Sequence, residues 1–181
     1  MINLLHIPKT GGTALRWGLD GYVEKWHHDH VITDLPDPVV TVLRDPVDRF
    51  VSCFDWSRYH TDIPWRSLDE AADMVARMAD DEMPLRYLFW PMTHWVGNHL
   101  ERCVYVARTE TLDADFEAIK HLFGLPPALR LPPPGDSKRN ELGEGVPRPR
   151  PPGWTGKSRI SPEAAAKVRA RYAEDYALLK E

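Results

Sequence analysis

Runs of apolar residues alternate with helix-like patterns along this chain. Ile2–Ile7 predict a short buried strand, and the five apolar or β-branched residues Val39–Leu43 are typical of a strand buried on both faces of a parallel sheet. Cys103–Ala107 predict a third buried strand. Apolar residues at helical spacing predict helices over Thr13–Trp26 and from Pro46 onward. This alternation indicates the α/β class, and we expect a P-loop-like, three-layer α/β/α arrangement with a small central parallel sheet.

Shorter signals complete the expected secondary structure. Val31–Thr33 predict another short strand, and Ser67 predicts a helix N-cap because a glutamate follows three residues later. Helical spacing over Pro84–Asn98 predicts a helix with a kink at its internal proline. Thr111 is expected to cap a further helix, and Ser161, which precedes a proline, to cap the last one.

The loop Pro8–Gly12 has the parts needed to hold an anion. Its two glycines, Gly11 and Gly12, let the backbone approach a ligand closely, and the helix that follows directs N–H groups and a positive dipole end at the same place. Lys9 adds a full charge, while Thr10 and Thr13 add hydroxyl donors. The lysine precedes the glycines, so the loop does not follow the Walker pattern. Considered alone, a structural turn explains it equally well.

A second stretch points to the same chemistry. Arg44 follows the strand Val39–Leu43, at the edge of a parallel sheet where ligands bind. Asp45 is expected to cap the next helix, and Ser52 lies about two turns into it, where it could share an anion with Arg44. The alternative is that Arg44 forms a surface ion pair with Asp45 or Asp48.

Composition limits the classes of function. The 181 residues are 43% hydrophobic and 28% charged, as expected for one globular domain. A net charge of −4 argues against general nucleic-acid binding. No segment is long and apolar enough for a membrane span, and the first strand is no signal peptide, so we expect a cytoplasmic protein without a membrane partner. His27, His28 and His30 suggest a metal, but the sequence offers them no further ligand at a suitable spacing, and no metal is predicted.

Two motifs in the right order resemble a known family. His6–Thr13, His-Ile-Pro-Lys-Thr-Gly-Gly-Thr, looks like the 5′-phosphosulfate loop of sulfotransferases that use 3′-phosphoadenosine 5′-phosphosulfate (PAPS). Leu43–Ser52 resembles their 3′-phosphate motif, and Val104–Phe116, followed by Gly124, is similar to a later strand and helix. The pattern is most similar to that of the carbohydrate (Golgi-type) enzymes and their bacterial counterparts.

The resemblance implies PAPS as donor, 3′,5′-adenosine bisphosphate (PAP) as product, and no metal. It implies a single sulfotransferase domain, 1–181, with its PAPS-binding core in 1–57 and its C-terminal helix in 161–181. The residues implied to hold the nucleotide are Pro8, Lys9, Thr10, Gly11, Gly12, Thr13, Ala14, Arg44 and Ser52.

A long proline-rich stretch, 126–160, is expected to act as a lid. It contains nine of the chain's 17 prolines, so a disordered linker is the alternative. The predicted elements on both sides favour a functional loop. In the family a late loop with a serine and basic residues closes over the nucleotide, and two segments are candidates here: Ser137, Lys138 and Arg139, or Gly156–Arg159.

The family also implies a base and an acceptor site. A His or Glu near this point of the chain often takes the proton, so His30 is our predicted base, with His28 and Glu24 as alternatives. His28, Trp90, His94 and Asn98 are predicted to contact the acceptor, although an aromatic stripe such as that around Trp90 also suits a core.

The expected reaction is in-line transfer of the sulfuryl group from PAPS to a hydroxyl, with Lys9 stabilising the developing charge. A sugar hydroxyl is favoured by the resemblance, while small alcohols, phenols and a peptide tyrosine stay open. Two other functions stay open: a P-loop kinase or phosphotransferase, and a non-catalytic nucleotide-binding protein. The oligomeric state is not predicted.

Overall fold

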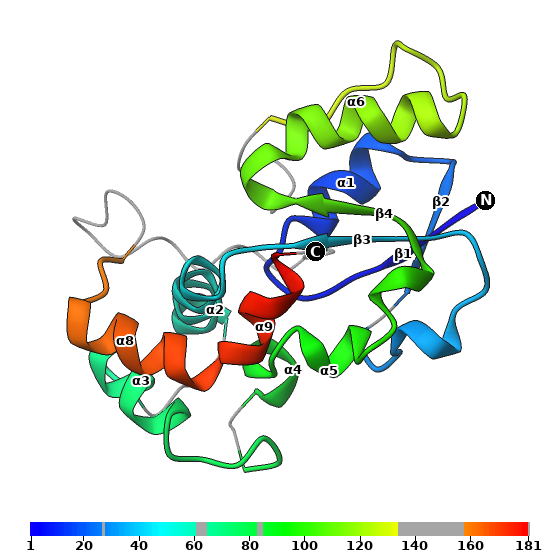
Figure 1. The fold of residues 1–181 in the computed structure, drawn as a ribbon. Helices are drawn as coiled ribbons and strands as arrows, with labels where there is room; N and C mark the ends of the chain where they lie inside the picture. The colour runs from blue at the N-terminus through cyan, green and yellow to red at the C-terminus, as the bar shows by residue number, and fades with distance from the viewer. Residues whose placement is uncertain (27, 61–64, 83–84, 134–157, 181) are drawn as a thin grey trace. The chain divides into compact units, whose positions relative to one another are not determined.

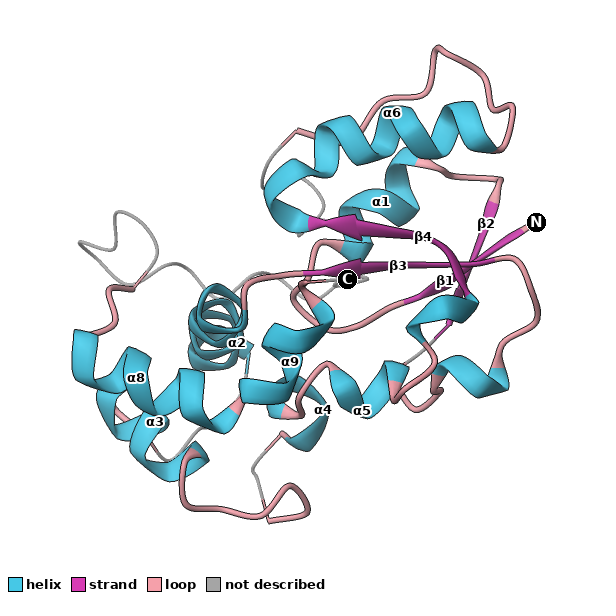
Figure 2. Ribbon diagram, viewed as in Figure 1, coloured by secondary structure: helices cyan, strands magenta, loops and turns pink. Residues whose placement is uncertain are grey.

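A four-stranded parallel sheet forms the centre of the fold. A computed structural model describes residues 1–26, 28–60, 65–82, 85–133 and 158–180. Its strands are β1 (Ile2–Leu5), β2 (Val23–Trp26), β3 (Val39–Leu43) and β4 (Cys103–Arg108), in the spatial order β2-β1-β3-β4. All three neighbouring pairs are parallel, and helices flank the sheet (Figure 2). The α/β fold class expected from the sequence is confirmed.

The chain divides into two compact units. The first comprises residues 1–44 and 92–143, and the second comprises 45–91 and 144–181. The sheet belongs entirely to the first unit, whereas the second is helical in its described part. The division falls directly after Arg44, at the end of β3.

The first unit packs two helices against one side of its sheet. Helices α1 (Gly12–Gly18) and α6 (Leu112–Leu122) lie on this side, and α5 (Thr93–Val96) lies on the other (Figure 1). Short 3₁₀ turns, η2 (Leu100–Arg102) and η3 (Thr109–Thr111), flank β4. The core between α1, α6 and the sheet includes Leu4, Leu15, Leu19, Val40, Val42, Phe116 and Ile119.

The helix predicted over Thr13–Trp26 is wrong in its second half. Helix α1 ends at Gly18, and Val23–Trp26 form the edge strand β2, which pairs with β1. A side chain at Gly18 would lie 2.8 Å from Phe116, so glycine is needed for the close approach of α6. Gly21 then takes a φ of 80°, which favours glycine and turns the chain back toward the sheet.

Two shorter predictions are also corrected. Val31–Thr33 were expected as a strand, but the chain forms the 3₁₀ turn η1 (Ile32–Asp34), in which Val31 N donates to the Asp34 carboxylate at 3.0 Å. The kinked helix expected over Pro84–Asn98 is two separate helices, α4 (Arg86–Phe89) and α5, with Pro91 between them. The proline ends one helix rather than bending a continuous one, because its ring excludes a helical hydrogen bond there.

The second unit is built from helices α2 (Pro46–His60), α3 (Leu68–Val75), α8 (Pro162–Arg171) and α9 (Ala173–Leu178), together with α4. Its predicted caps are confirmed: Asp45 accepts from Val47 N and Asp48 N, Ser67 from Glu70 N, and Ser161 from Ala164 N. The Thr111 side chain does not cap α6 and donates to Asp115 instead. The core of the second unit includes Phe50, Phe54, Trp65, Leu68, Val75, Phe89, Val168 and Tyr172.

Candidate functional site

The candidate site is the loop between β1 and α1. Lys9 has a φ of 65° and Gly11 a φ of 99°, so two of the three residues Lys9–Gly11 adopt the left-handed conformation. Thr10 is fully buried, and its hydroxyl donates to the Ile7 carbonyl at 2.9 Å. The sequence predicted this hydroxyl as a donor to a ligand. In the structure it instead holds the turn itself together.

Side chains from the ends of β3 and β4 hold the loop. Arg44 Nη1 donates to the Lys9 carbonyl at 3.0 Å. The Thr109 hydroxyl donates to the Thr10 carbonyl and also lies 3.2 Å from the Leu43 carbonyl. Arg44 is only 8% exposed, and its Nε is buried without a hydrogen-bond partner among the described residues. Arg44 therefore faces the loop. Its position does not require the ion pair with Asp45 or Asp48 that was the alternative prediction.

A histidine ring explains why the loop ends in glycine. His6, which follows β1 two residues before the loop, is 5% exposed, and a Cβ on Gly12 would clash with its Cδ2. The His6 Nε2 lies 3.3 Å from the Thr13 hydroxyl. The sequence indicated flexible glycines, but it gave no signal that Gly12 makes room for His6.

His28, predicted as an alternative base to His30, lies beside this loop. Its Nδ1 donates to the His6 carbonyl at 3.1 Å, and the two imidazole rings lie 5.0 Å apart. A neutral ring with the proton on Nδ1 carries its lone pair on Nε2. The fully buried Trp95 donates to the His28 carbonyl at 3.0 Å and fixes the backbone there.

The other two candidate bases lie on more exposed positions. His30 is 37% exposed at its side chain, and its Nε2 is 4.0 Å from the Asp29 carboxylate. Glu24 is exposed on the edge strand β2.

The predicted acceptor residues divide between the two units. His94 and Asn98 are exposed in the first unit, and the His94 ring packs edge-on against Trp95, with centroids 5.2 Å apart. Trp90 belongs to the second unit, where its indole N–H donates to the Asp80 carbonyl and its own carbonyl accepts from Arg49. The acceptor role of all three stays a prediction.

The remaining nucleotide-binding predictions are placed as follows. Pro8 is buried at the start of the loop, and Ala14 is half-buried in the first turn of α1. Ser52 lies on α2, in the second unit, so its sharing of an anion with Arg44 stays a prediction. Ser137, Lys138 and Arg139 lie outside the described residues.

One end of the alternative lid segment is described. Ser158 donates to the Asp55 carboxylate at 2.5 Å through its hydroxyl and at 3.1 Å through its backbone N–H. Asp55 lies on α2, three residues after Ser52, so the two side chains lie close together on one face of this helix. This contact attaches Ser158 to the helix that carries Ser52.

Neither a metal cluster nor a membrane helix is found in the described part of the chain. It holds no group of three His, Cys, Asp or Glu side chains positioned to bind a metal ion, and His27 lies outside it. Among the same residues, every helix is too short or too polar to cross a bilayer.

The parallel sheet with its strand–loop–helix unit defines an α/β protein of P-loop-like type. Residues 23–180 match the model of the sulfotransferase family. This chain belongs to the sulfotransferase family, and it is a transferase of sulfuryl groups. No curated protein and no solved structure matches it in the comparisons. The matched range begins after the loop Pro8–Gly12.

Proposed function

We propose that the protein transfers the sulfuryl group of PAPS to a hydroxyl of a carbohydrate acceptor. The observation that carries the proposal is the hydrogen bond from Arg44 to the Lys9 carbonyl. It joins the two stretches that resemble the 5′-phosphosulfate loop and the 3′-phosphate motif. Lys9 and Arg44 thus come from neighbouring parts of one sheet edge. An adenine nucleotide with phosphate groups at its 3′ and 5′ positions requires two such cationic residues.

The residues around the loop fit such a donor. A buried N–H without an acceptor is costly, and the Arg44 Nε is a donor that a phosphate oxygen would satisfy. Lys9 is half-buried and supplies a mobile charge beside the loop amides. When bound, PAPS supplies the activated sulfuryl group. Lys9 then stabilises negative charge that develops on the oxygen leaving sulfur.

His28 is the base that we favour for the acceptor hydroxyl. Support comes from its hydrogen bond to the His6 carbonyl, which orients the ring and leaves the lone pair on Nε2. His30 is retained as the alternative. We place His94 on the acceptor side, because it packs on Trp95, which in turn holds the His28 backbone.

Nucleotide titration tests the donor. Calorimetry should show tighter binding of PAP than of 5′-AMP, and tighter binding of PAP than of ATP with magnesium. Arg44→Ala removes the hydrogen bond to the Lys9 carbonyl for both nucleotides, but only PAP also loses a charge-assisted contact to its second phosphate. PAP should therefore lose about 1.5–3 kcal/mol more binding free energy than 5′-AMP. Equal losses for the two nucleotides would contradict the assignment of Arg44, and a preference for ATP with magnesium would indicate a kinase instead.

An acceptor panel tests the reaction. Transfer of labelled sulfate from PAPS is measured with sugars, small alcohols, phenols and a tyrosine peptide. We expect the sugars to be the best acceptors. Binding of PAP without transfer to any member would contradict the enzymatic proposal and support a nucleotide-binding protein.

A further inference from the structure

Thr109 occupies a position that ties three parts of the site together. It follows β4 and opens the turn η3. The register pairs Leu43 of β3 with Arg108 of β4, so the next residues, Arg44 and Thr109, leave the sheet side by side. Each reaches a different carbonyl of the loop: Arg44 that of Lys9, and Thr109 that of Thr10.

These two contacts determine which way the loop amides point. In a trans peptide the C=O and the following N–H lie on opposite sides of the bond. When the Lys9 and Thr10 carbonyls face the strand ends, the N–H groups of Thr10 and Gly11 must face the other way. Donors directed together in this manner are what an anion requires.

The Thr109 side chain also lies close to Gly11 of the loop. A Cβ on Gly11 would lie 3.7 Å from the Thr109 hydroxyl and 3.8 Å from its methyl group. The same hydroxyl lies 3.2 Å from the Leu43 carbonyl, so it links the loop to the end of β3 as well as to β4. One side chain therefore connects β3, β4 and the loop.

We propose that Thr109 is a positioning residue for the donor loop: its hydroxyl holds the Thr10 carbonyl, so that the Thr10 and Gly11 amides face the phosphosulfate group of the donor. The role rests on the proposed function as far as the donor is concerned. The orientation of the loop itself does not depend on which ligand binds.

Three variants test this role. Thr109→Val keeps the shape and removes the hydroxyl, whereas Thr109→Ser keeps the hydroxyl. Thr111→Val is the matched control, because this threonine lies in the same turn and its hydroxyl donates to Asp115 at 2.8 Å rather than to the loop. The first readout is the pair of ¹H–¹⁵N resonances of Gly11 and Gly12 in the ligand-free protein, and the second is the dissociation constant of PAP.

We expect Thr109→Val to shift or broaden the Gly11 resonance and to weaken PAP about fivefold to tenfold, the effect of one hydrogen bond. Thr109→Ser should keep the Gly11 resonance and the dissociation constant of PAP as in the wild type. Thr111→Val should change neither of these two quantities. Unchanged glycine resonances in Thr109→Val would overturn the proposal, and so would an equal effect of Thr111→Val. If the wild type binds no PAP, the proposed donor is wrong, and the glycine resonances alone decide whether Thr109 positions the loop.

Discussion

Lys9 and Arg44 illustrate how single residues at this site have more than one task. Lys9 offers its carbonyl to Arg44, whereas its side chain has the proposed role toward the donor. Its backbone adopts a left-handed conformation that non-glycine residues seldom take. Such strain persists only where neighbouring contacts enforce it. The Arg44 hydrogen bond is one such contact.

Lys9→Ala should lower turnover strongly and affect the affinity for PAP less. The oxygen between phosphorus and sulfur gains charge only as the bond to sulfur breaks, so a cation there favours the transition state over the bound donor. Steady-state rates are compared with the dissociation constant of PAP. Lys9→Arg keeps the charge and is expected to retain part of the activity, although its planar group sits differently. Near-normal turnover of Lys9→Ala would show that the loop only binds.

A comparison of His28→Ala with His30→Ala identifies the base. We expect the first to lower turnover by roughly 10²-fold or more, because an oriented general base contributes about that much. The affinity for PAP should stay within a few-fold in both variants. His28→Gln serves as a control that keeps a polar side chain of similar reach. If only His30→Ala loses turnover, the base is His30, as the sequence alone suggested.

At the scale of elements, strong local patterns were predictive and weak ones were not. The strands β1, β3 and β4 and the helices α2, α3, α6 and α8 were all expected from their apolar patterns. Strand β4 is less buried than predicted, because Val104 is 48% exposed and only Ala107 within Cys103–Ala107 is buried. Strand β2 was not, because Val23–Trp26 continue a helical pattern and only pairing with β1 makes them a strand. Tertiary pairing of this kind overrides local propensity.

The residues of the candidate site show the same difference between local signals and long-range contacts. The loop and Arg44 were predictable, since glycines, a lysine and a strand end lie in short segments of sequence. Thr109 and His6 were not recognised, because their roles come from contacts that only the folded chain makes: Thr109 with Thr10, 99 residues away, and His6 packed against Gly12. Long-range partners leave no signal in a single sequence.

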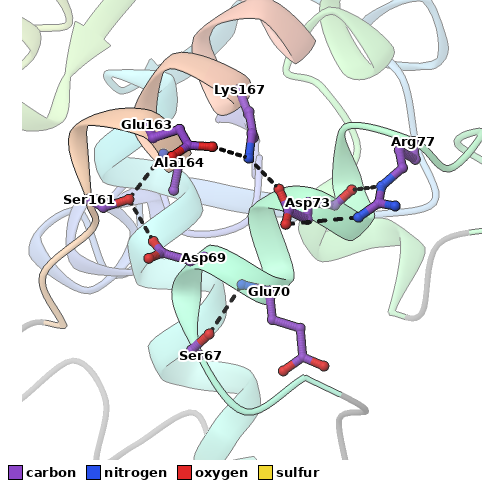
Figure 3. A network of polar contacts seen from close by, with 9 residues as sticks. All are labelled: Ser67, Asp69, Glu70, Asp73, Arg77, Ser161, Glu163, Ala164 and Lys167. Carbon is purple, nitrogen blue, oxygen red and sulfur yellow. Dashed lines mark hydrogen bonds and ion pairs between the residues drawn. The ribbon is translucent and has the colours of Figure 1, made fainter.

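Helices α3 and α8 are joined by a polar network (Figure 3). Lys167 lies 2.7 Å from Asp73 and 2.8 Å from Glu163, and Ser161 donates to Asp69 at 2.9 Å. The hydrogen bond from Lys167 lowers the pKa of Asp73. Hydrogen bonds to Asp73 and then Glu163 raise the pKa of Lys167 to about 12.

The stabilisation by this network should therefore depend on pH at both extremes. A lowered Asp73 pKa gives a contribution that is complete above the ordinary value of 3.8 and is lost as the pH falls through the lowered value. The raised pKa of Lys167 gives a second contribution to stability, which is complete below pH 10.5 and is lost as the pH rises through about 12.

The difference in Tm between wild type and Lys167→Met should therefore be constant between pH 3.8 and pH 10.5, and it should shrink at lower and at higher pH. Arg77→Met is the control, because Arg77 is 77% exposed and lies 3.8 Å from Asp73. A difference that does not vary with pH would show that Lys167 acts through packing alone.

At the scale of the whole molecule, each unit has a core of its own. The sheet unit buries Leu4, Val40 and Ile119 in one cluster, and the helical unit buries Phe50, Phe89 and Tyr172 in another. Around Phe89, three successive carbonyls are held by side chains: Leu88 by Arg49 and Cys53, Phe89 by Tyr172, and Trp90 by Arg49. Burial raises the pKa of the Tyr172 hydroxyl, so it stays a donor throughout the working range of pH.

Tyr172→Phe should consequently loosen the helical unit and leave the sheet unit protected. The hydroxyl donates to the Phe89 carbonyl at 2.6 Å, and a buried acceptor that loses its donor costs about 1–3 kcal/mol. Native-state hydrogen exchange is the measurement, because units with separate cores can open separately. We expect faster exchange in α2, α3 and α4, with β1 and β3 unchanged.

The reciprocal variant is Ile119→Val, which removes one methyl group from the core of the sheet unit and should cost about 0.5–1.5 kcal/mol there. It should accelerate exchange in β1, β3 and α6 while α2 and α3 keep their protection. If both variants accelerate exchange equally throughout the chain, the two units open as one cooperative body, and the separate cores do not correspond to separate folding units.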